Sequence, residues 1–292
     1  MINMVTGEKS KTSARVAIGV LSAFSAIWVA PILFTILQSF RPFADVVVKG
    51  VMSFPTHLTF SNYYHAFVQS RMWLFFLNSC EVAIPAVVLT LFLASMIAFV
   101  LSRYESRFSV PMLMLFTAGN LLPPQLLFIP LFRIFLKIHV PHFINSNGVL
   151  YDTQLGLILV HVAIQIGFAT FVLTNFLRTI PKEISESALV DGANVWNHFF
   201  RIILPLLRPA LASLGVLMTT WIYNDFFWAV VLLKTGNKRP ITAALSNLQG
   251  EFNTDYNLLA AGACMAFIPT LLVFFAMRKH FVAGLTLGST KG

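Results

Sequence analysis

The sequence predicts an all-α membrane protein with six transmembrane helices. Of the 292 residues, 57% are hydrophobic and only 11% are charged, whereas an average soluble domain is about 25% charged. The apolar residues gather in long runs, and Lys and Arg fall mostly between those runs. So few polar side chains cannot cover a soluble surface. Lipid is therefore the expected solvent for most of the chain.

Six apolar runs are long enough to span a bilayer. A spanning helix needs about 20 apolar residues, because the hydrocarbon layer is about 30 Å thick and a helix rises about 1.5 Å per residue. Backbone groups in lipid must find hydrogen-bond partners within their own segment, so each run is expected to be a helix. The runs are residues 16–40, 78–101, 110–132, 154–177, 209–233 and 256–277.

The positions of Lys and Arg predict how the chain is organised. One transmembrane domain, residues 16–277, lies between two tails, residues 1–15 and 278–292. Lys and Arg are moderately more frequent in the connections on the side of the N-terminus, so this side is expected to be cytoplasmic. Six spans place both tails and the loop 178–208 there. The first apolar run is too long for a cleavable signal peptide, so it is expected to be a retained helix.

Several kinds of site and partner are not expected. A net charge of +9 could attract nucleic acid, but the basic residues form no single patch. They lie mostly between the apolar runs, a placement that suits the edges of a membrane. The chain contains no phosphate-binding loop, zinc-protease motif, C-x-x-C motif or nucleophile elbow. Cys80 and Cys264 lie in apolar runs and are expected to be small buried hydrophobes. We therefore expect no catalytic residue, no metal and no enzyme activity in this chain.

Three ionisable residues fall inside the expected spans, namely Glu81, His161 and Asp225. Two roles are open for Asp225: it lines a solute path together with Asn224, or it makes a structural hydrogen bond to a neighbouring helix. His161 is more typical of a packing residue, and Glu81 lies near the outer end of its span. An ion-coupled carrier usually places several facing ionisable groups in its spans, so this inventory favours a solute channel powered by another protein.

The loop 181–205 predicts two short helices joined at about a right angle on the cytoplasmic surface. Pro181 favours a first helical turn, and Glu183 suits the positive end of a helix dipole. Gly192 permits a turn that other residues resist, and a second helical stretch leads to Pro205. The small residues of this loop leave room for a partner to approach, although an ordinary interfacial amphipathic helix has a similar composition. These small residues are Ser187, Ala188, Gly192 and Ala193.

The order of residues in this loop resembles that of ABC importer permeases. In that family, Glu-Ala-Ala is followed at fixed intervals by Gly and by Ile-x-Leu-Pro. The matching residues here are Glu186, Ser187, Ala188, Gly192, Ile202, Leu204 and Pro205, with Asp191 beside the glycine as is typical. Ser187 replaces the central alanine of the family pattern.

The resemblance extends over nearly the whole chain and is closest to the carbohydrate-uptake branch, in particular to the second membrane subunit of maltose-type transporters. The segments that carry it are Asn78-Ser79, residues 98–103, Pro124, residues 129–131, residues 221–227 and the ending from Phe281 through Gly288 to Gly292.

The resemblance implies the type I ABC importer permease fold, with a coupling helix between the fourth and fifth spans. It implies a bacterial cytoplasmic (inner) membrane protein that pairs with a second permease, two ATPase subunits and an extracytoplasmic solute-binding protein. ATP and Mg²⁺ then bind the ATPase, and this chain holds no cofactor. Glu186 is the expected docking acid, Gly192 the hinge, and Ala188 and Ala193 the close-contact positions.

The expected cargo is a sugar or oligosaccharide. Another polar solute such as a glycerol phosphate is the main alternative, and an ion-coupled carrier or a membrane scaffold without ATPase is a further one. The resemblance also implies that the Gly-Leu-Thr-Leu-Gly tail, residues 284–288, reaches the ATPase.

Overall fold

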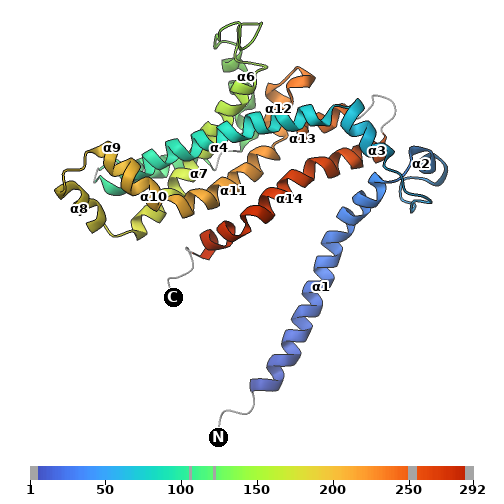
Figure 1. Cartoon of the computed structure of the whole chain (residues 1–292), viewed down its shortest axis with the longest axis horizontal. Helices are drawn as coiled ribbons and strands as arrows, with labels where there is room; N and C mark the ends of the chain where they lie inside the picture. The colour runs from blue at the N-terminus through green and yellow to red at the C-terminus, as the bar shows by residue number, and fades with distance from the viewer. Residues whose placement is uncertain (1–5, 105–106, 121–122, 249–254, 287–292) are drawn as a thin grey trace. The chain divides into compact units, whose positions relative to one another are not determined.

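The computed structural model describes residues 6–104, 107–120, 123–248 and 255–286. These residues form helices and connecting loops, with a single isolated β-bridge between His139 and Val149 and no β-strand. Four helices are long and apolar enough to cross a membrane (Figure 1). They are α1 (Thr6–Ser39), α4 (Met72–Arg103), α7 (Gln154–Thr179) and α14 (Tyr256–Thr286).

Two further apolar runs are interrupted, so the expectation of six transmembrane helices is only partly confirmed. The run 110–132 forms α5 (Ser109–Gly119) and α6 (Pro124–Phe135), whose axes differ by 94°. Pro123 and Pro124 lie at this bend, and a proline disfavours helical geometry in the residue before it. If each bent pair counts as one span, the described part of the chain has six.

The fifth run is also interrupted, so the expected single helix over residues 209–233 is wrong. The helix α11 (Arg208–Tyr223) ends inside the run, and α12 (Phe227–Leu232) begins after a short break. Before α11, the segment Val195–Leu206 meets it at an angle of 69°. The break between α11 and α12 contains both Asn224 and Asp225.

The expected tails are partly helical. The first helix begins at Thr6 instead of near residue 16, and α14 continues beyond residue 277 to Thr286. The remaining residues of the expected C-terminal pattern, including Gly288, Lys291 and Gly292, lie outside the described residues.

The chain divides into two compact units. The larger comprises residues 72–247 and 266–292, and in it α4, α7 and α11 run side by side (Figure 1). Small residues let these helices approach closely, as is common in membranes. A Cβ atom on Gly167 of α7 would lie 2.5 Å from the carbonyl oxygen of Phe116 on α5. Four alanines in the core of this unit, all 0% exposed, are Ala86 and Ala94 and Ala98 of α4 and Ala169 of α7.

The smaller unit comprises residues 1–71 and 248–265. It contains α1, α2 (Phe43–Lys49), α3 (Ser61–Tyr64), the π-helix η1 (His65–Gln69) and the first turns of α14. Side-chain amides fasten these parts around the main chain at Arg41: Asn62 Nδ2 and Asn257 Nδ2 donate to its carbonyl oxygen at 2.8 and 2.6 Å. The end of α1 is thereby joined to the start of α14.

A cluster around Asp152 fixes the end of the larger unit where α7 begins. Asp152 has a left-handed backbone conformation, with φ of 62°. Its carboxylate accepts hydrogen bonds from the Thr235 hydroxyl at 2.6 Å and the Thr235 amide at 2.9 Å, and it lies 3.3 Å from Lys238 Nζ. Burial alone would raise the pKa of Asp152, but these contacts outweigh it and lower the pKa below its usual value.

The loop that follows α12 is held at this same end by α4. The Asn78 amide donates to the carbonyl oxygens of Asn237 and Arg239, and the Ser79 hydroxyl accepts from the Ile241 amide. The loop contains the short helices η3 (Gly236–Lys238), α13 (Ile241–Ala244) and η4 (Leu245–Leu248).

Replacing Asp152 is expected to loosen this end of the bundle. Because hydrogen bonds to a charged group contribute about 1.5–3 kcal/mol, Asp152→Ala should lower the free energy of unfolding by about 2 kcal/mol. The folded-state pKa is lowered, so this contribution is complete above the unfolded pKa of about 3.9 and disappears as pH falls through the folded value. Thermal unfolding in detergent measures the loss, and Lys234→Ala, an exposed change in the same loop, is the control. Equal unfolding midpoints for the two variants at pH 7 would contradict the assignment.

Candidate functional site

The connection between α7 and α11 forms an elbow, which we define as residues 181–206. Its outer arm is α8 (Glu183–Val190), and its inner arm is made of α9 (Val195–Asn197), the π-helix η2 (His198–Ile203) and α10 (Leu204–Leu206). Glu183 and Glu186 occupy the first turn of α8, where the helix dipole favours negative charge. The expected pair of short helices is thus present.

Gly192 makes the turn that separates the two arms. Its φ is +79°, and no atom lies within 4 Å of the position that a Cβ would take. The Ala193 amide donates to Ala188 O and the Gly192 amide to Leu189 O, both at 3.0 Å. This pair of bonds is a Schellman motif, which ends a helix with a left-handed residue. The backbone conformation, not crowding, therefore demands glycine here.

The inner arm is packed into the helical bundle. Phe199, Ile203 and Leu207 are fully buried in the core of the larger unit. The Phe99 ring on α4 meets the rings of His198 and Phe199 with centroids 5.0 and 5.5 Å apart. The inner arm of the elbow is therefore packed directly against α4 and leads into α11.

A hydrogen bond joins the residue just before the elbow to the same end of α4. Arg103 Nη1, at the last residue of α4, donates to the Ile180 carbonyl oxygen at 3.1 Å, just before α8 begins. The elbow follows the last residue of α7 and Asp152 precedes its first, so the two lie at opposite ends of this helix.

The residues expected from the sequence divide between the two surfaces of the elbow. Glu186, Ser187, Asp191 and Gly192 are exposed, whereas Ile202, Leu204, Pro205 and Ala193 are half-buried. Ala188 is buried on the inner side of α8. Its small side chain is therefore packed inside the elbow.

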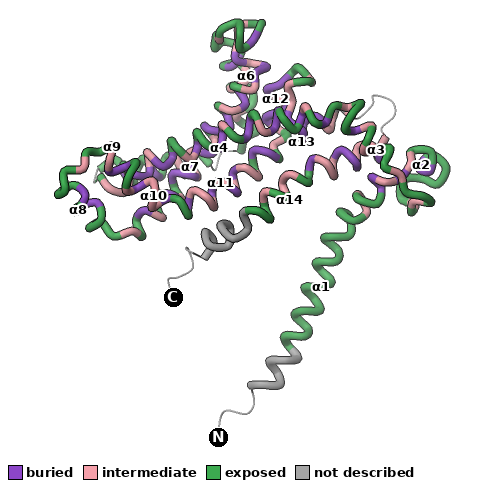
Figure 2. The backbone as a smooth tube through the Cα atoms, in the orientation of Figure 1, coloured by how far each residue is buried: buried purple, intermediate pink, exposed green. Residues whose placement is uncertain are grey.

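Large apolar side chains cover much of the exposed surface of the elbow, and the sequence reasoning did not single them out. Val190 is 86% exposed and Trp196 is 62% exposed, and Leu189 and Val195 are exposed beside them in the sequence. Figure 2 shows α8 as largely exposed. A signal was present in the sequence, because a short glycine-centred turn with apolar residues on both sides is unusual on a free surface. Glu186 and these apolar residues together make a surface suited to a protein partner.

The second candidate site is the break between α11 and α12. The Asp225 carboxylate accepts from the Ala229 amide at 3.1 Å and more weakly from the Trp228 amide at 3.4 Å, so it caps α12. Its main-chain carbonyl accepts from the Thr242 hydroxyl at 2.6 Å, and its Oδ2 lies 3.7 Å from His161 Nε2 on α7. Asp225 therefore has a structural role within this chain, beside His161.

Asn224 is exposed at this break. Its amide nitrogen donates to Thr220 O at 2.8 Å and lies 3.5 Å from the Thr270 hydroxyl of α14. The structure thus brings Asn224 and Asp225 to one polar interruption of an otherwise apolar helix. It does not bring them near the elbow, which lies at the other end of α11.

The sequence profile of one family matches residues 90–286, a stretch that contains both candidate sites. The family is described as the binding-protein-dependent transport system inner membrane component. This chain belongs to that family.

Individual relatives of this transport component agree with the assignment. The arabinooligosaccharides transport system permease protein AraQ of Halalkalibacterium halodurans is 30% identical, over 92% of this chain and 93% of the relative. The osmoprotective compounds uptake permease protein GgtD of Synechocystis sp. is 33% identical, over 91% of this chain and 88% of the relative. The melibiose/raffinose/stachyose import permease protein MelC of Bacillus subtilis is 28% identical, over 90% and 91%.

Solved structures show the same fold. A bacterial ABC transporter that imports the acidic polysaccharide alginate contains a chain that superposes with a TM-score of 0.78 at 22% identity, covering 94% of this chain and 98% of that one. In a complex of the alginate transporter with its pentasaccharide-bound periplasmic protein, the TM-score is 0.68 at 16% identity, covering 92% and 94%. The expected all-helical fold is therefore shared with a chain of an ABC importer, while the exact set of six helices is not confirmed.

The Gly192 turn of this membrane component provides a direct test of the elbow's geometry. A left-handed residue with a Cβ costs about 1–2 kcal/mol, so Gly192→Ala should speed hydrogen exchange at the Ala193 amide by about 5- to 30-fold. Hydrogen exchange with mass spectrometry measures this in the peptide that covers α8 and α9. Gly215→Ala is the control, because its Cβ would meet only Leu91 at 3.5 Å, an ordinary contact. Unchanged exchange in Gly192→Ala would mean that the turn tolerates a side chain.

Proposed function

We propose that this chain forms half of the translocation pathway of an ABC importer for a sugar or oligosaccharide. A solute-binding protein delivers the cargo on the extracytoplasmic side, and a second permease completes the pathway. Two separate ATPase subunits bind ATP and Mg²⁺ on the cytoplasmic side, where both termini and the elbow lie. The observation that carries the proposal is the elbow, because it presents an acid and exposed apolar side chains beside a glycine turn at one end of the bundle.

The elbow is better suited to a protein than to the membrane surface. Glu183, Glu186 and Asp191 are all exposed on or beside α8, and carboxylates are repelled by the anionic lipids of the cytoplasmic leaflet. An interfacial amphipathic helix is instead usually rich in Lys and Arg on its polar face. The exposed Trp196 and Val190 supply the apolar anchors of a protein interface. An ATPase cleft that receives α8 accounts for this combination.

The contacts of the elbow also allow a displacement of α8 to reach the helices of the bundle. Its inner arm is continuous with α11 and packs on α4, so a displacement of α8 by the ATPase moves both helices. Closure of the ATPase pair on binding ATP then rocks the bundle between inward-open and outward-open states. Alternating access of this kind is driven by a two-state element outside the chain.

The break at Asn224 supports a role in the solute pathway. Non-helical backbone at membrane depth is tolerated only where it is buried in protein or lines a water-filled cavity. The exposed side chain of Asn224 offers a hydrogen-bond donor and an acceptor, which suit a sugar hydroxyl. Asp225 fixes the start of α12 after the break by capping this helix.

The names of relatives favour a carbohydrate as cargo. Besides AraQ and MelC, similar proteins include the diacetylchitobiose uptake permease NgcG of Streptomyces coelicolor and the alpha-glucoside transport permease AglG of Rhizobium meliloti. The carboxylate of Asp225 beside Asn224 also disfavours an anionic cargo such as a glycerol phosphate. A neutral polyol fits this break better.

The role of Glu186 is tested by charge reversal. Glu186→Lys should abolish transport and association with the ATPase, while the chain still inserts into the membrane. Glu183→Lys is a matched control, since it makes the same change in the same helical turn and should retain most of the transport. Co-purification of the ATPase with the tagged chain and uptake of labelled sugar give the two readouts. Normal transport by Glu186→Lys would remove the acid from the docking surface.

The role of the break is tested by Asn224→Ala and Asp225→Asn. Asn224→Ala should lower the rate of sugar uptake by about tenfold, because a good hydrogen bond is worth about 1.5 kcal/mol and 1.4 kcal/mol is a factor of ten. Asp225→Asn should lower the uptake rate as well, because it weakens the cap that fixes the start of α12 at the break. Association with the ATPase should stay unchanged. Uptake and co-purification are measured on the same membranes. Equal loss of both would indicate a folding defect instead of a pathway role.

The proposal as a whole is tested with the assembled complex in vesicles. ATP hydrolysis should rise when the solute-binding protein is added with its sugar, and a panel of sugars, polyols and phosphates identifies the cargo. Uptake should be insensitive to a protonophore as long as ATP is present. Transport by the chain alone that collapses with the protonophore would establish the ion-coupled alternative.

A further inference from the structure

The segment that follows α1 has its polar groups inside and its apolar groups outside. We call residues 42–58 the platform; they comprise α2 and the loop after it. Arg41, directly before the platform, is 0% exposed. A loop that faces water usually exposes its charged side chains and buries its apolar ones, and this segment has the opposite distribution.

The buried guanidinium of Arg41 organises the interior. Its Nη1 donates to the carbonyl oxygens of Gly50, Val51 and Ser53 at 3.0–3.3 Å. Its Nε donates to Asp45 Oδ2 at 2.8 Å, forming a buried ion pair. These three loop carbonyls therefore find a hydrogen-bond partner within the chain.

Asp45 balances this charge. The Thr56 hydroxyl donates to Asp45 Oδ1 at 2.6 Å and, together with Arg41, holds the pKa of the Asp45 carboxyl well below its usual range. The ion pair is thus maintained at physiological pH. Lys49 is the other charged residue of the platform, and its ammonium group lies 3.8 Å from Asp45 Oδ1.

The outside of the platform is apolar. Val48 is 81% exposed and Met52 is 83% exposed, and both are surrounded in the sequence by other large exposed hydrophobic residues. These residues are Val47, Phe54 and Leu58. So many exposed apolar side chains within 17 residues are not typical of a surface in water.

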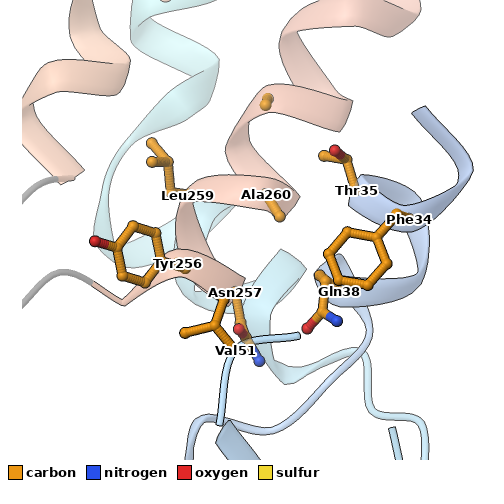
Figure 3. Close-up of a pocket in the computed structure, with 9 residues that line it drawn as sticks. Phe34, Thr35, Gln38, Val51, Tyr256, Asn257, Leu259 and Ala260 are labelled. Carbon is orange, nitrogen blue, oxygen red and sulfur yellow. The ribbon is translucent and has the colours of Figure 1, made fainter. Parts of the chain in front are cut away.

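A pocket beside the platform extends this apolar surface. It has a volume of about 270 Å³ and lies between the end of α1 and the start of α14. Figure 3 shows Val51 of the platform together with Phe34 of α1 and with Leu259 and Ala260 of α14 along its wall. Its lining is mostly apolar, which suits the end of a lipid acyl chain.

The position of the platform in the chain indicates what covers it. The spanning helix α1 ends at Ser39, two residues before Arg41. The platform therefore begins where α1 leaves the hydrocarbon. We propose that the platform inserts its apolar surface into the lipid headgroup boundary at this end of α1 and anchors the smaller unit in the bilayer.

The contacts within the platform explain why this is possible. Backbone groups near hydrocarbon must be satisfied within the protein, and Arg41 supplies the donors that three loop carbonyls need. The long stem of Lys49 lets its charge reach the headgroups while the neighbouring valines remain in lipid. This surface lies outside residues 90–286, which the family profile matches, and the proposal does not depend on the cargo or on the ATPase.

Spin labels measure the surroundings of the platform directly. In a background of Cys80→Ser and Cys264→Ser, single nitroxide labels are placed by Val48→Cys and Met52→Cys, and the full complex is reconstituted in vesicles of phosphatidylethanolamine and phosphatidylglycerol. Phe143→Cys is a matched control, since Phe143 is an equally exposed apolar residue, 88% exposed, in a loop expected to face water. Trp28→Cys in the middle of α1 is an exposed position expected to face lipid.

The expected result is that oxygen strongly increases the relaxation rate of the labels at positions 48 and 52, whereas a water-soluble nickel chelate increases it only weakly. The label at position 28 should behave in the same way, and the label at position 143 should show the opposite pattern. Strong relaxation by the nickel chelate at positions 48 and 52 would place the platform in water and overturn the proposal. Protection from both reagents would overturn it as well, because another protein subunit would then cover the surface. Repeating the measurement without the solute-binding protein shows whether that protein is the one that protects positions 48 and 52.

Discussion

The structure depends on one constraint: every backbone polar group at membrane depth must find a partner within the protein. In α4 and α7 the helix itself provides these partners. Where the fifth apolar run breaks, the carboxylate of Asp225 accepts from the Ala229 amide, and Thr242 donates to the Asp225 carbonyl oxygen. Where the chain turns after α1, Arg41 donates to a row of loop carbonyls. Asp225 and Arg41 are thus placed where the helical pattern stops.

The elbow follows a different rule because it lies beyond the end of the bundle. Its inner arm is buried through Phe199 and Ile203, so it moves as part of the helical body. Its outer arm exposes Glu186, Val190 and Trp196, an arrangement that is stable when a second protein covers it. One segment of chain thus joins a docking surface to the helices that form the proposed pathway. Membership of the binding-protein-dependent transport family agrees with this division.

The sequence predicted the composition of the spans better than their shape. Hydropathy identified all the apolar runs, but it could not show that two of them are interrupted, because an average over about 20 residues is insensitive to one interrupted turn. Pro123 and Pro124 marked the first interruption. At the second, Asp225 was treated as a residue within a helix, although Asp commonly caps a helix. The glycine turn was predicted correctly, since the need for a positive φ is a local property.

Contacts between distant residues were beyond prediction from one sequence. The hub around Arg41 joins residues as far apart as Asn257 and Gly50, and nothing in the local pattern distinguishes this arginine from one at a membrane edge. Similarly, the alanine at position 188 faces inward because of the packing of α8 on η2. The family resemblance indicated that the elbow is important for function. Only the structure divides its residues into an inner and an outer surface.

The central claim is that the outer surface of the elbow contacts the ATPase. A photo-crosslinking amino acid at Val190, the most exposed apolar position of the elbow, tests this most directly in membranes that contain the whole transporter. The account predicts an adduct between this chain and the ATPase subunit, and none with the solute-binding protein. An adduct with lipid alone, or with the solute-binding protein, would contradict it.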